Sequence, residues 1–216
     1  MARLRPVTFA EGFTLKTFPD VFFPDWEKAE RSEMVALIDN CDVLVDVGAN
    51  HGFYSVMADH LGKPAIAIEP EETNLAVLRE NAKNRRIEVI PIAVGDRAGV
   101  ITLYGDADIA STLPGWGRER FFRQTVPVQT LDSVIRQRVS NGRLLIKVDV
   151  EGAEDAVLAG ATETLGRDGT WIIETMEAMP DGRPCPAFDR VFEVMGGAGF
   201  KGRLIEGEDR NWIFER

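Results

Sequence analysis

Two apolar segments, each closed by an acidic residue, constrain the fold more than any other feature of this chain. The first, VLVDVGANHGFY at residues 43–54, ends its apolar run at Asp46 and enters a turn with Gly48 and Gly52. The second, AIAIEP at residues 65–70, ends in Glu69, roughly 20 residues further on. Glycines let the backbone turn sharply and approach a ligand, and a carboxylate placed like Glu69 accepts both hydroxyls of a ribose. The pattern predicts a strand, turn, helix and strand that bind a nucleoside.

The residues within the turn disfavour the commoner phosphate-binding motifs. A dinucleotide fingerprint has the form GxGxxG, but Asn50 and Phe53 stand at its second and third glycines. A P-loop needs Lys and Ser or Thr after its last glycine, where Phe53 and Tyr54 stand instead. S-adenosylmethionine carries ribose and adenine without phosphate, and its amino-acid end suits Asp46, Asn50 and exposed backbone N–H groups. The turn therefore favours S-adenosylmethionine, with an ordinary tight turn of an α/β domain as the alternative.

Size and charge narrow the class of protein further. A chain of 216 residues with 44% hydrophobic content is expected to form one domain around one large core. The net charge of −10 and the pI of about 4.8 predict repulsion of nucleic acids and of anionic membrane surfaces. The two cysteines fit no metal or disulfide spacing, no signal core is evident, and no apolar run is long enough to span a membrane. These features predict a cytoplasmic protein.

Apolar periodicity along the chain predicts alternating strands and helices. The expected architecture is an α/β fold with a doubly wound, mostly parallel, seven-stranded sheet of Rossmann-like type. The predicted helices cover residues 25–38, 52–62, 73–84, 131–139, 153–165 and 188–200. The predicted strands cover residues 43–46, 65–69, 87–94, 144–150, 170–176, 201–206 and 211–216, the last two as a closing antiparallel pair.

Two segments depart from this alternation. Residues 1–40 are rich in aromatics and are expected to pack on the core of a domain at residues 41–216, although they suit a homodimer interface as well. Residues 96–128 are expected to form a hairpin-like insertion, with Pro127 at a strand edge. Its glycines and aromatics suggest a lid over the acceptor, formed by Ser111, Trp116, Phe121 and Phe122.

A second group of polar residues follows later strands of the predicted sheet. Ligands of open α/β sheets bind at the carboxyl ends of the strands, which makes Lys147, Asp149 and Glu174 candidates. Lys147 and Asp149 lie two residues apart in an apolar strand, where charges are costly unless paired or functional. Glu151 and Glu154 suit the first turn of a helix. The two histidines, His51 and His60, form no predicted metal site, and His51 either faces a ligand or is solvated in the turn.

Several motifs in order resemble the FkbM family of S-adenosylmethionine-dependent methyltransferases. They are DVGANHGFYS, IEPEETNLAVLRENAKN, AVGDRAGVITL, VQTLDSV and KVDVEGAEDAVLAG, and they cover about residues 43–165. The resemblance implies a class I methyltransferase sheet with a reversed last strand, and methylation of an oxygen, often a sugar or polyketide hydroxyl. It places the methionine part of the donor at Asp46, Gly48, Asn50 and Gly52 with Ala49 in the same turn, the ribose at Glu69, the adenine beside Ala93 and Val94, and the transferred methyl beside Asp149.

The predicted reaction depends on positioning, because methyl transfer from a sulfonium needs little covalent help. We expect Asp149 to take the proton of the hydroxyl or to orient the acceptor, and Lys147 to fix Asp149 or to stabilise the developing alkoxide. Glu174, Ser111 and Trp116 are expected on the side of the acceptor. A protein that binds the nucleoside cofactor without catalysis is the alternative, and an NAD-dependent oxidoreductase is a weaker one because its glycine spacing is missing.

Overall fold

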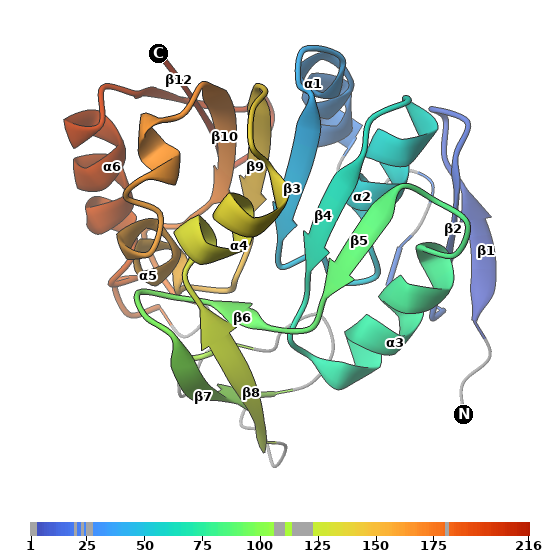
Figure 1. The fold of residues 1–216 in the computed structure, drawn as a ribbon, viewed down its shortest axis with the longest axis horizontal. Coiled ribbons are helices and arrows are strands. Elements are labelled where there is room, and N and C mark those ends of the chain that lie inside the picture. Colours follow the sequence, from blue (N-terminus) through green and yellow to red (C-terminus); the bar gives the residue numbers. More distant parts are fainter. Residues whose placement is uncertain are drawn as a thin grey trace.

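The computed structural model describes residues 4–19, 21–22, 24, 28–105, 111–113, 123–179 and 182–216. Its main sheet has seven strands, of which five are parallel and β12 runs antiparallel to both of its neighbours (Figure 1). In order across the sheet the strands are β11 (Lys201–Leu204), β12 (Asn211–Glu215), β10 (Gly169–Glu174), β9 (Leu144–Val148), β3 (Val43–Val47), β4 (Ala65–Ile68) and β5 (Ile87–Ile90). The seven-stranded, mostly parallel sheet with a reversed last strand is confirmed.

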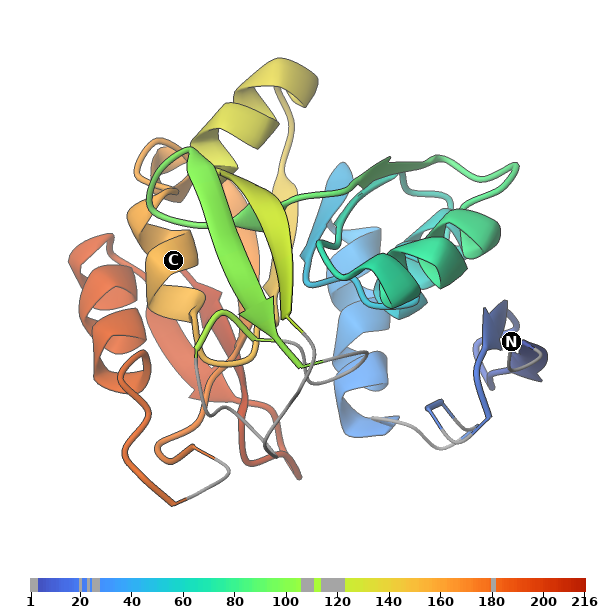
Figure 2. The ribbon, with the colours of Figure 1, turned by 90° about the horizontal axis from the view of Figure 1, so that it is seen from below.

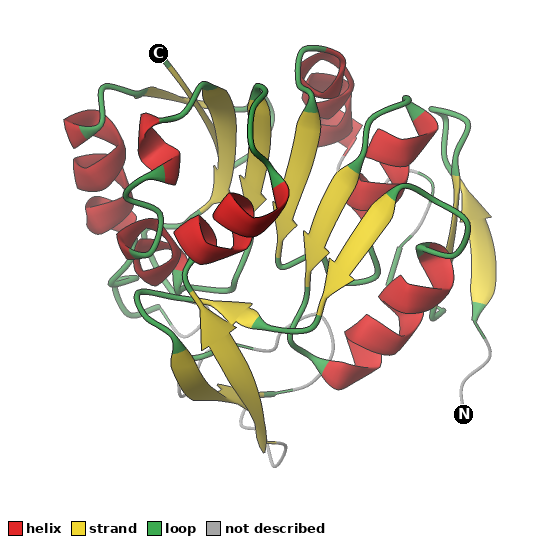
Figure 3. Ribbon diagram, in the orientation of Figure 1, coloured by secondary structure: helices red, strands yellow, loops and turns green. Residues whose placement is uncertain are grey.

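Helices cover both faces of this sheet, which explains why its central strands are apolar throughout (Figure 3). One face packs against α1 (Lys28–Asp39), α2 (Phe53–His60) and α3 (Glu72–Asn81). The other face packs against α4 (Leu131–Arg138), α5 (Glu154–Ala159) and α6 (Phe188–Gly197). Along β3 the buried side chains alternate, so that Leu44 belongs to the first layer and Val45 and Val47 to the second. The doubly wound arrangement is therefore confirmed.

Two predicted elements are interrupted in the structure. The strand expected over residues 87–94 stops at Pro91, which has no N–H for the ladder, and β6 (Ala93–Val94) joins a different sheet. The helix expected over residues 153–165 ends at Ala159. Gly160 then lies so close to the chain that a Cβ there would stand 2.1 Å from the carbonyl oxygen of Gly95. A separate 3-10 turn, η2 (Thr164–Gly166), follows.

The insertion forms a second sheet across the carboxyl ends of the parallel strands. Figure 2, which looks at that edge, shows β7 (Gly99–Tyr104) and β8 (Arg123–Gln129) crossing in front of it. The order is β6-β8-β7, and β6 pairs only with the last two residues of β8. Pro127 therefore pairs with β7 alone, so it occupies an edge position although β8 is the central strand. The predicted lid residues Trp116, Phe121 and Phe122 lie outside the described residues.

The N-terminal segment packs against α2. Strands β1 (Arg5–Thr8) and β2 (Thr14–Thr17) form a hairpin, and three rings of this segment surround Phe53. The ring centroid of Phe53 lies 4.8 Å from that of Phe9, 5.2 Å from that of Phe13 and 5.5 Å from that of Phe22. Burial of aromatic rings is a large source of stability, so this cluster fixes the segment to the core.

Candidate active site

An open cleft of about 690 Å³ lies where the parallel strands end beneath the insertion. Several predicted residues meet there: Gly48 and Asn50 follow β3, Glu69 follows β4, and Asp149 follows β9, with Ala93 and Val94 supplied by β6. The structure adds residues that the sequence argument missed, among them Asn74 of α3, Leu103 of β7 and Thr112. Only the crossing of the insertion over the sheet brings the last two to the cleft.

The turn after β3 depends on glycine at one position above all. Gly48 has φ of 85°, and a Cβ there would lie 1.7 Å from the carbonyl oxygen of Asp149. Its N–H donates to Ile68 O at 3.0 Å, and the Asp149 N–H donates to Val47 O at 3.0 Å. These contacts bring the donor-side turn against the Asp149 backbone.

Glu69 is held by backbone groups on both of its oxygens. Oε2 accepts from Asn50 N at 2.8 Å and Oε1 accepts from Glu71 N at 2.8 Å. Burial outweighs these hydrogen bonds and raises the pKa of Glu69 to about 7. Each carboxylate oxygen accepts more than one hydrogen bond, so the group retains capacity for the two hydroxyls of a ribose.

Three residues predicted at the cofactor lie behind the cleft rather than in its lining. Asp46 is buried and accepts from Ser55 Oγ at 2.7 Å, and its burial raises its pKa. Ala49 packs with a small apolar cluster beneath α3. Gly52 has φ of 87°, and a Cβ there would meet Leu78 Cδ1 at 2.5 Å. In this structure the three shape the turn, and their direct contact with a ligand stays a prediction.

Lys147 and Asp149 form an ion pair at the end of β9. Lys147 Nζ lies 3.0 Å from Asp149 Oδ2, 3.8 Å from Glu30 Oε1 and 5.0 Å from the ring centroid of Tyr54. Lys147 and Glu30 are buried, whereas Asp149 is partly exposed toward the cleft. The burial of Lys147 is thus compensated by ion pairing and by an aromatic face. The sequence did not predict Glu30 of α1 as a site residue, because a charged residue in a helix usually faces solvent.

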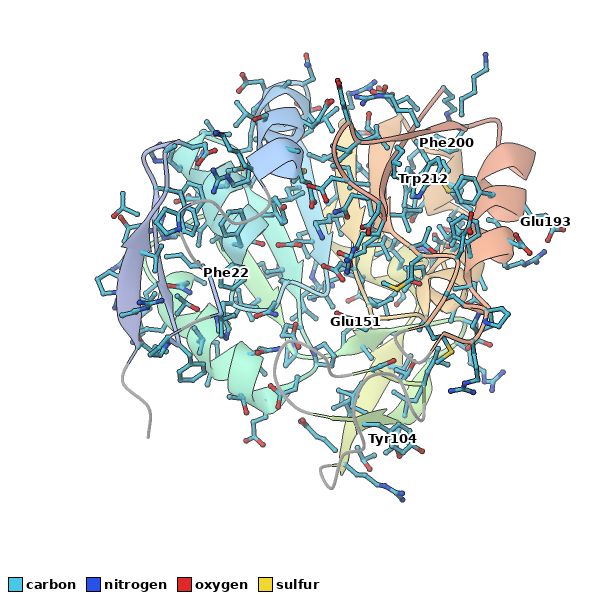
Figure 4. The ribbon with its side chains drawn as sticks, turned by 180° about the vertical axis from the view of Figure 1, so that it is seen from behind. Phe22, Tyr104, Glu151, Glu193, Phe200 and Trp212 are labelled. Carbon is cyan, nitrogen blue, oxygen red and sulfur yellow. The ribbon has the colours of Figure 1, made fainter. Side chains whose placement is uncertain are left out.

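A smaller cavity adjoins the cleft, and Asp149 and Glu151 line both. Glu174, predicted on the acceptor side, lines it and lies 3.6 Å from Arg210 Nη1. Glu154 also lines it, and burial raises its pKa to about 8, helped by the nearby charges of Asp149 and Glu151 and opposed by backbone hydrogen bonds. Figure 4 shows Glu151 between the main sheet and the part of the insertion that carries Tyr104.

Two further predicted residues remain without a demonstrated role. Ser111 is buried, and its hydroxyl donates to Glu151 O at 2.6 Å and accepts from Leu113 N at 3.0 Å. It ties the insertion to the loop after β9, and its contact with an acceptor stays a prediction. Trp116 lies outside the described residues.

His51 does not face solvent, so that prediction was wrong, and it lies outside the lining of the cleft. Its side chain is 1% exposed, its Nδ1 lies 2.9 Å from Thr17 Oγ1, and its ring contacts Phe18 and Phe22. Burial lowers the pKa of His51 to about 4, so the ring is neutral near neutral pH. His51 therefore connects the turn to the N-terminal hairpin.

The described part of the chain carries neither a metal-binding cluster nor a membrane-spanning helix. There, no three His, Cys, Asp or Glu side chains are grouped in a way that suits a metal ion. No helix among those residues has the length and apolar character needed to cross a membrane.

The sheet order, the reversed β12 and the cleft at the strand ends define a class I methyltransferase fold. An S-adenosylmethionine-dependent methyltransferase from Agrobacterium tumefaciens has a TM-score of 0.54 at 10% identity, covering 99% of this chain and 70% of that one. Precorrin-6y C5,15-methyltransferase from Geobacter metallireducens has a TM-score of 0.53 at 13% identity, covering 93% and 92%. These likenesses establish the fold.

The sequence identifies the family. Residues 46–201 match the methyltransferase FkbM domain, and the chain belongs to this family of S-adenosylmethionine-dependent methyltransferases. The 31-O-demethyl-FK506 methyltransferase FkbM of Streptomyces tacrolimicus is 32% identical, with 56% of this chain and 60% of that relative covered. The chain thus spans three fifths of the length of this curated relative. The family resemblance and the cofactor S-adenosylmethionine, both predicted from the motifs, are confirmed.

Proposed function

We propose that the protein transfers a methyl group from S-adenosylmethionine to a hydroxyl oxygen of a small molecule such as a sugar or a polyketide. The observation that carries this proposal is the position of Asp149, which lines both the larger cleft and the adjoining cavity. A carboxylate at this junction is placed to meet a donor on one side and an acceptor on the other. The S. tacrolimicus relative supports oxygen as the target, because its name specifies a 31-O position.

The residues of the cleft fit a nucleoside donor. Glu69 presents two fixed carboxylate oxygens for the ribose, and the absence of a Cβ at Gly48 keeps the turn close to Asp149. Ala93 and Val94 give an apolar wall that suits the flat face of adenine. Asn50, with φ of 51°, offers its side chain at the methionine end of the cleft.

Asp149 is the general base in this proposal. When bound, S-adenosylmethionine supplies an electrophilic methyl group on a positively charged sulfur. Asp149 holds the hydroxyl of the acceptor by accepting its hydrogen bond, and it takes the proton as the oxygen loses it. Proton transfer by a positioned side chain typically contributes about 10²–10⁴ in rate.

Lys147 acts on Asp149 as a positioning residue. Its ammonium is buried and bonded to Asp149 Oδ2, which fixes the carboxylate and leaves Oδ1 for the acceptor. Glu30 of α1 also lies near this ammonium, with its Oε1 at 3.8 Å. The charge of Lys147 is therefore shared between Asp149 and Glu30.

The substitution Asp149→Asn tests the assignment, because it keeps the shape and removes the base. We expect turnover to fall by about 10²–10⁴, while the affinity for S-adenosylhomocysteine stays within about threefold. Asp96→Asn, at an exposed carboxylate beside the insertion, is the matched control and should change neither quantity. Near-normal turnover of Asp149→Asn with intact cofactor binding would remove Asp149 from the chemistry.

Calorimetry with adenosylmethionine, adenosylhomocysteine and NAD separates the proposed activity from its alternatives. A methyltransferase should bind the first two and not NAD, and a screen of hydroxylated small molecules with labelled donor should identify the acceptor. Binding without methyl transfer to any acceptor, and without slow release of adenosylhomocysteine, would favour a cofactor-binding protein. A cytoplasmic location, exclusion of nucleic acid and a homodimer stay predictions from composition.

A further inference from the structure

The cavity beside Asp149 contains two buried polar atoms that no described residue satisfies. Glu154 and Thr175 both line it, and each is 2% exposed. Glu154 Oε1 accepts from Gly152 N at 2.9 Å, whereas Glu154 Oε2 and Thr175 Oγ1 have no hydrogen-bond partner within the described part of the chain. Leaving a buried polar atom unsatisfied costs about 1–3 kcal/mol, so such atoms usually meet a ligand or a water molecule.

These two atoms come from separate elements that meet at the cavity. Thr175 follows β10 and is held there by its backbone N–H, which donates to Arg210 O at 2.9 Å. Glu154 begins α5 on the neighbouring connection after β9. The Thr175 main chain is thus fixed by a hydrogen bond to Arg210 O, and the Glu154 side chain by the bond from Gly152 N to Oε1.

We propose that Glu154 and Thr175 form an acceptor subsite that binds a second hydroxyl, close to the hydroxyl that is methylated at Asp149. The acceptor is accordingly a diol or polyol rather than an isolated alcohol. This inference rests on the proposed function, because it places the reacting hydroxyl at Asp149.

The chemistry of the two side chains selects a hydroxyl. With its pKa raised to about 8, Glu154 is protonated at neutral pH, and the proton belongs on Oε2 because Oε1 accepts from Gly152. A hydroxyl accepts from this O–H and donates to Thr175 Oγ1, whereas an ammonium only donates. Asp149, Glu154 and Thr175 line the same small cavity, so the second hydroxyl must lie near the first.

The test measures binding of three small probes to the protein loaded with S-adenosylhomocysteine, by NMR titration. The probes are ethane-1,2-diol, propan-1-ol and 2-aminoethanol, which differ by a single group at the position that would enter the subsite. We expect the diol to bind on the order of tenfold more tightly than propan-1-ol, because propan-1-ol leaves both buried atoms unsatisfied. We expect 2-aminoethanol to bind more weakly than the diol near pH 7.

Two substitutions assign the preference to the subsite. Thr175→Val removes the hydroxyl at nearly constant shape and should abolish the preference for the diol, without lowering the melting temperature. Glu154→Gln keeps a donor in place of the protonated oxygen and should retain the preference within a few-fold. Thr125→Val, an exposed threonine of β8, is the control and should behave as the wild type.

Each result decides between the proposals. Equal affinities for the diol and propan-1-ol would show that the cavity holds water only, and a preference that survives Thr175→Val would show that the diol binds elsewhere. Either result would overturn the subsite. Tighter binding of 2-aminoethanol that is lost in Glu154→Gln would show an amine site instead. If S-adenosylhomocysteine itself does not bind, the proposed function fails, and the subsite falls with it.

Discussion

Replacement of Gly48 by alanine tests whether the turn must touch the backbone at Asp149. Both Gly48 and Gly62 have positive φ, of 85° and 88°, so alanine meets a similar conformational cost of about 1–2 kcal/mol at each. A Cβ at Gly62 has nothing within 4 Å, whereas a Cβ at Gly48 would lie 1.7 Å from the carbonyl oxygen of Asp149. The difference in stability between Gly48→Ala and Gly62→Ala therefore measures the cost of the contact between residue 48 and the Asp149 carbonyl.

The magnitude follows from the displacement that relieves the overlap. Real Cβ atoms essentially never approach within 3.0 Å of another heavy atom, so the turn and Asp149 must separate by more than 1 Å (3.0 − 1.7 = 1.3 Å). That movement breaks the two 3.0 Å backbone hydrogen bonds between the turn, β4 and Asp149, at about 0.5–1.5 kcal/mol each. Adding the conformational cost gives a loss of about 2–5 kcal/mol for Gly48→Ala, against about 1–2 kcal/mol for Gly62→Ala.

Urea unfolding and calorimetry with S-adenosylhomocysteine measure the two consequences. We expect Gly62→Ala to bind S-adenosylhomocysteine like the wild type, and Gly48→Ala to lose about tenfold or more in affinity. Gly52→Ala should lie between them, because its Cβ meets the end of the flexible Leu78 side chain at 2.5 Å. The reasoning is refuted if Gly48→Ala is no less stable than Gly62→Ala, or if it keeps the wild-type affinity.

Three further predictions concern the surroundings of the cleft. Glu69 must be ionised to accept both ribose hydroxyls, so we expect the affinity for S-adenosylhomocysteine to fall as the pH drops below about 7, and Glu69→Gln to remove this dependence in calorimetry at several pH values. Burial acts to raise the pKa of Asp132, but hydrogen bonds from Glu163 and Thr164 hold it below its usual value. Ionised Asp132 therefore stabilises the folded protein above the usual aspartate pKa of about 4, and this stabilisation is lost as the pH falls. Asp132→Asn should cost about 1–3 kcal/mol in urea unfolding near pH 7, and less in acid. Asn81 bonds the Lys16 backbone and the carbonyl of His51, so Asn81→Ala should accelerate hydrogen exchange in β1 and β2.

The residues that line the cleft were predictable where a strand end determines their position. Parallel strands finish at one edge of the sheet, so Gly48, Glu69 and Asp149, distant in sequence, had to meet there. The same rule brought Lys147 to Asp149, although it left open whether the lysine was paired or functional. Sheet topology thus accounts for the parts of the site that follow β3, β4 and β9.

Residues supplied by packing between elements could not be predicted in this way. Glu30 lies in the charged first half of α1, beside exposed Lys28 and buried Arg31, and nothing in the local sequence pattern shows which of these charges is buried. Thr112 and Leu103 reach the cleft only because the insertion folds back over the strand ends. The break at Pro91 was missed because the apolar residues continue on both sides of it, which outweighed its missing N–H.

The N-terminal segment precedes the region that matches the family, yet it supports the site from two directions. Thr17 contacts His51 in the donor-side turn, and Asn81 fixes β2 to the same turn. Glu30 contacts Lys147 behind Asp149. The turn is thereby held by β4 on one side and by the hairpin on the other, since Gly48 N donates to Ile68 O. Changes at Thr17 therefore act on the donor turn, and changes at Glu30 act through Lys147 on the carboxylate that faces the acceptor.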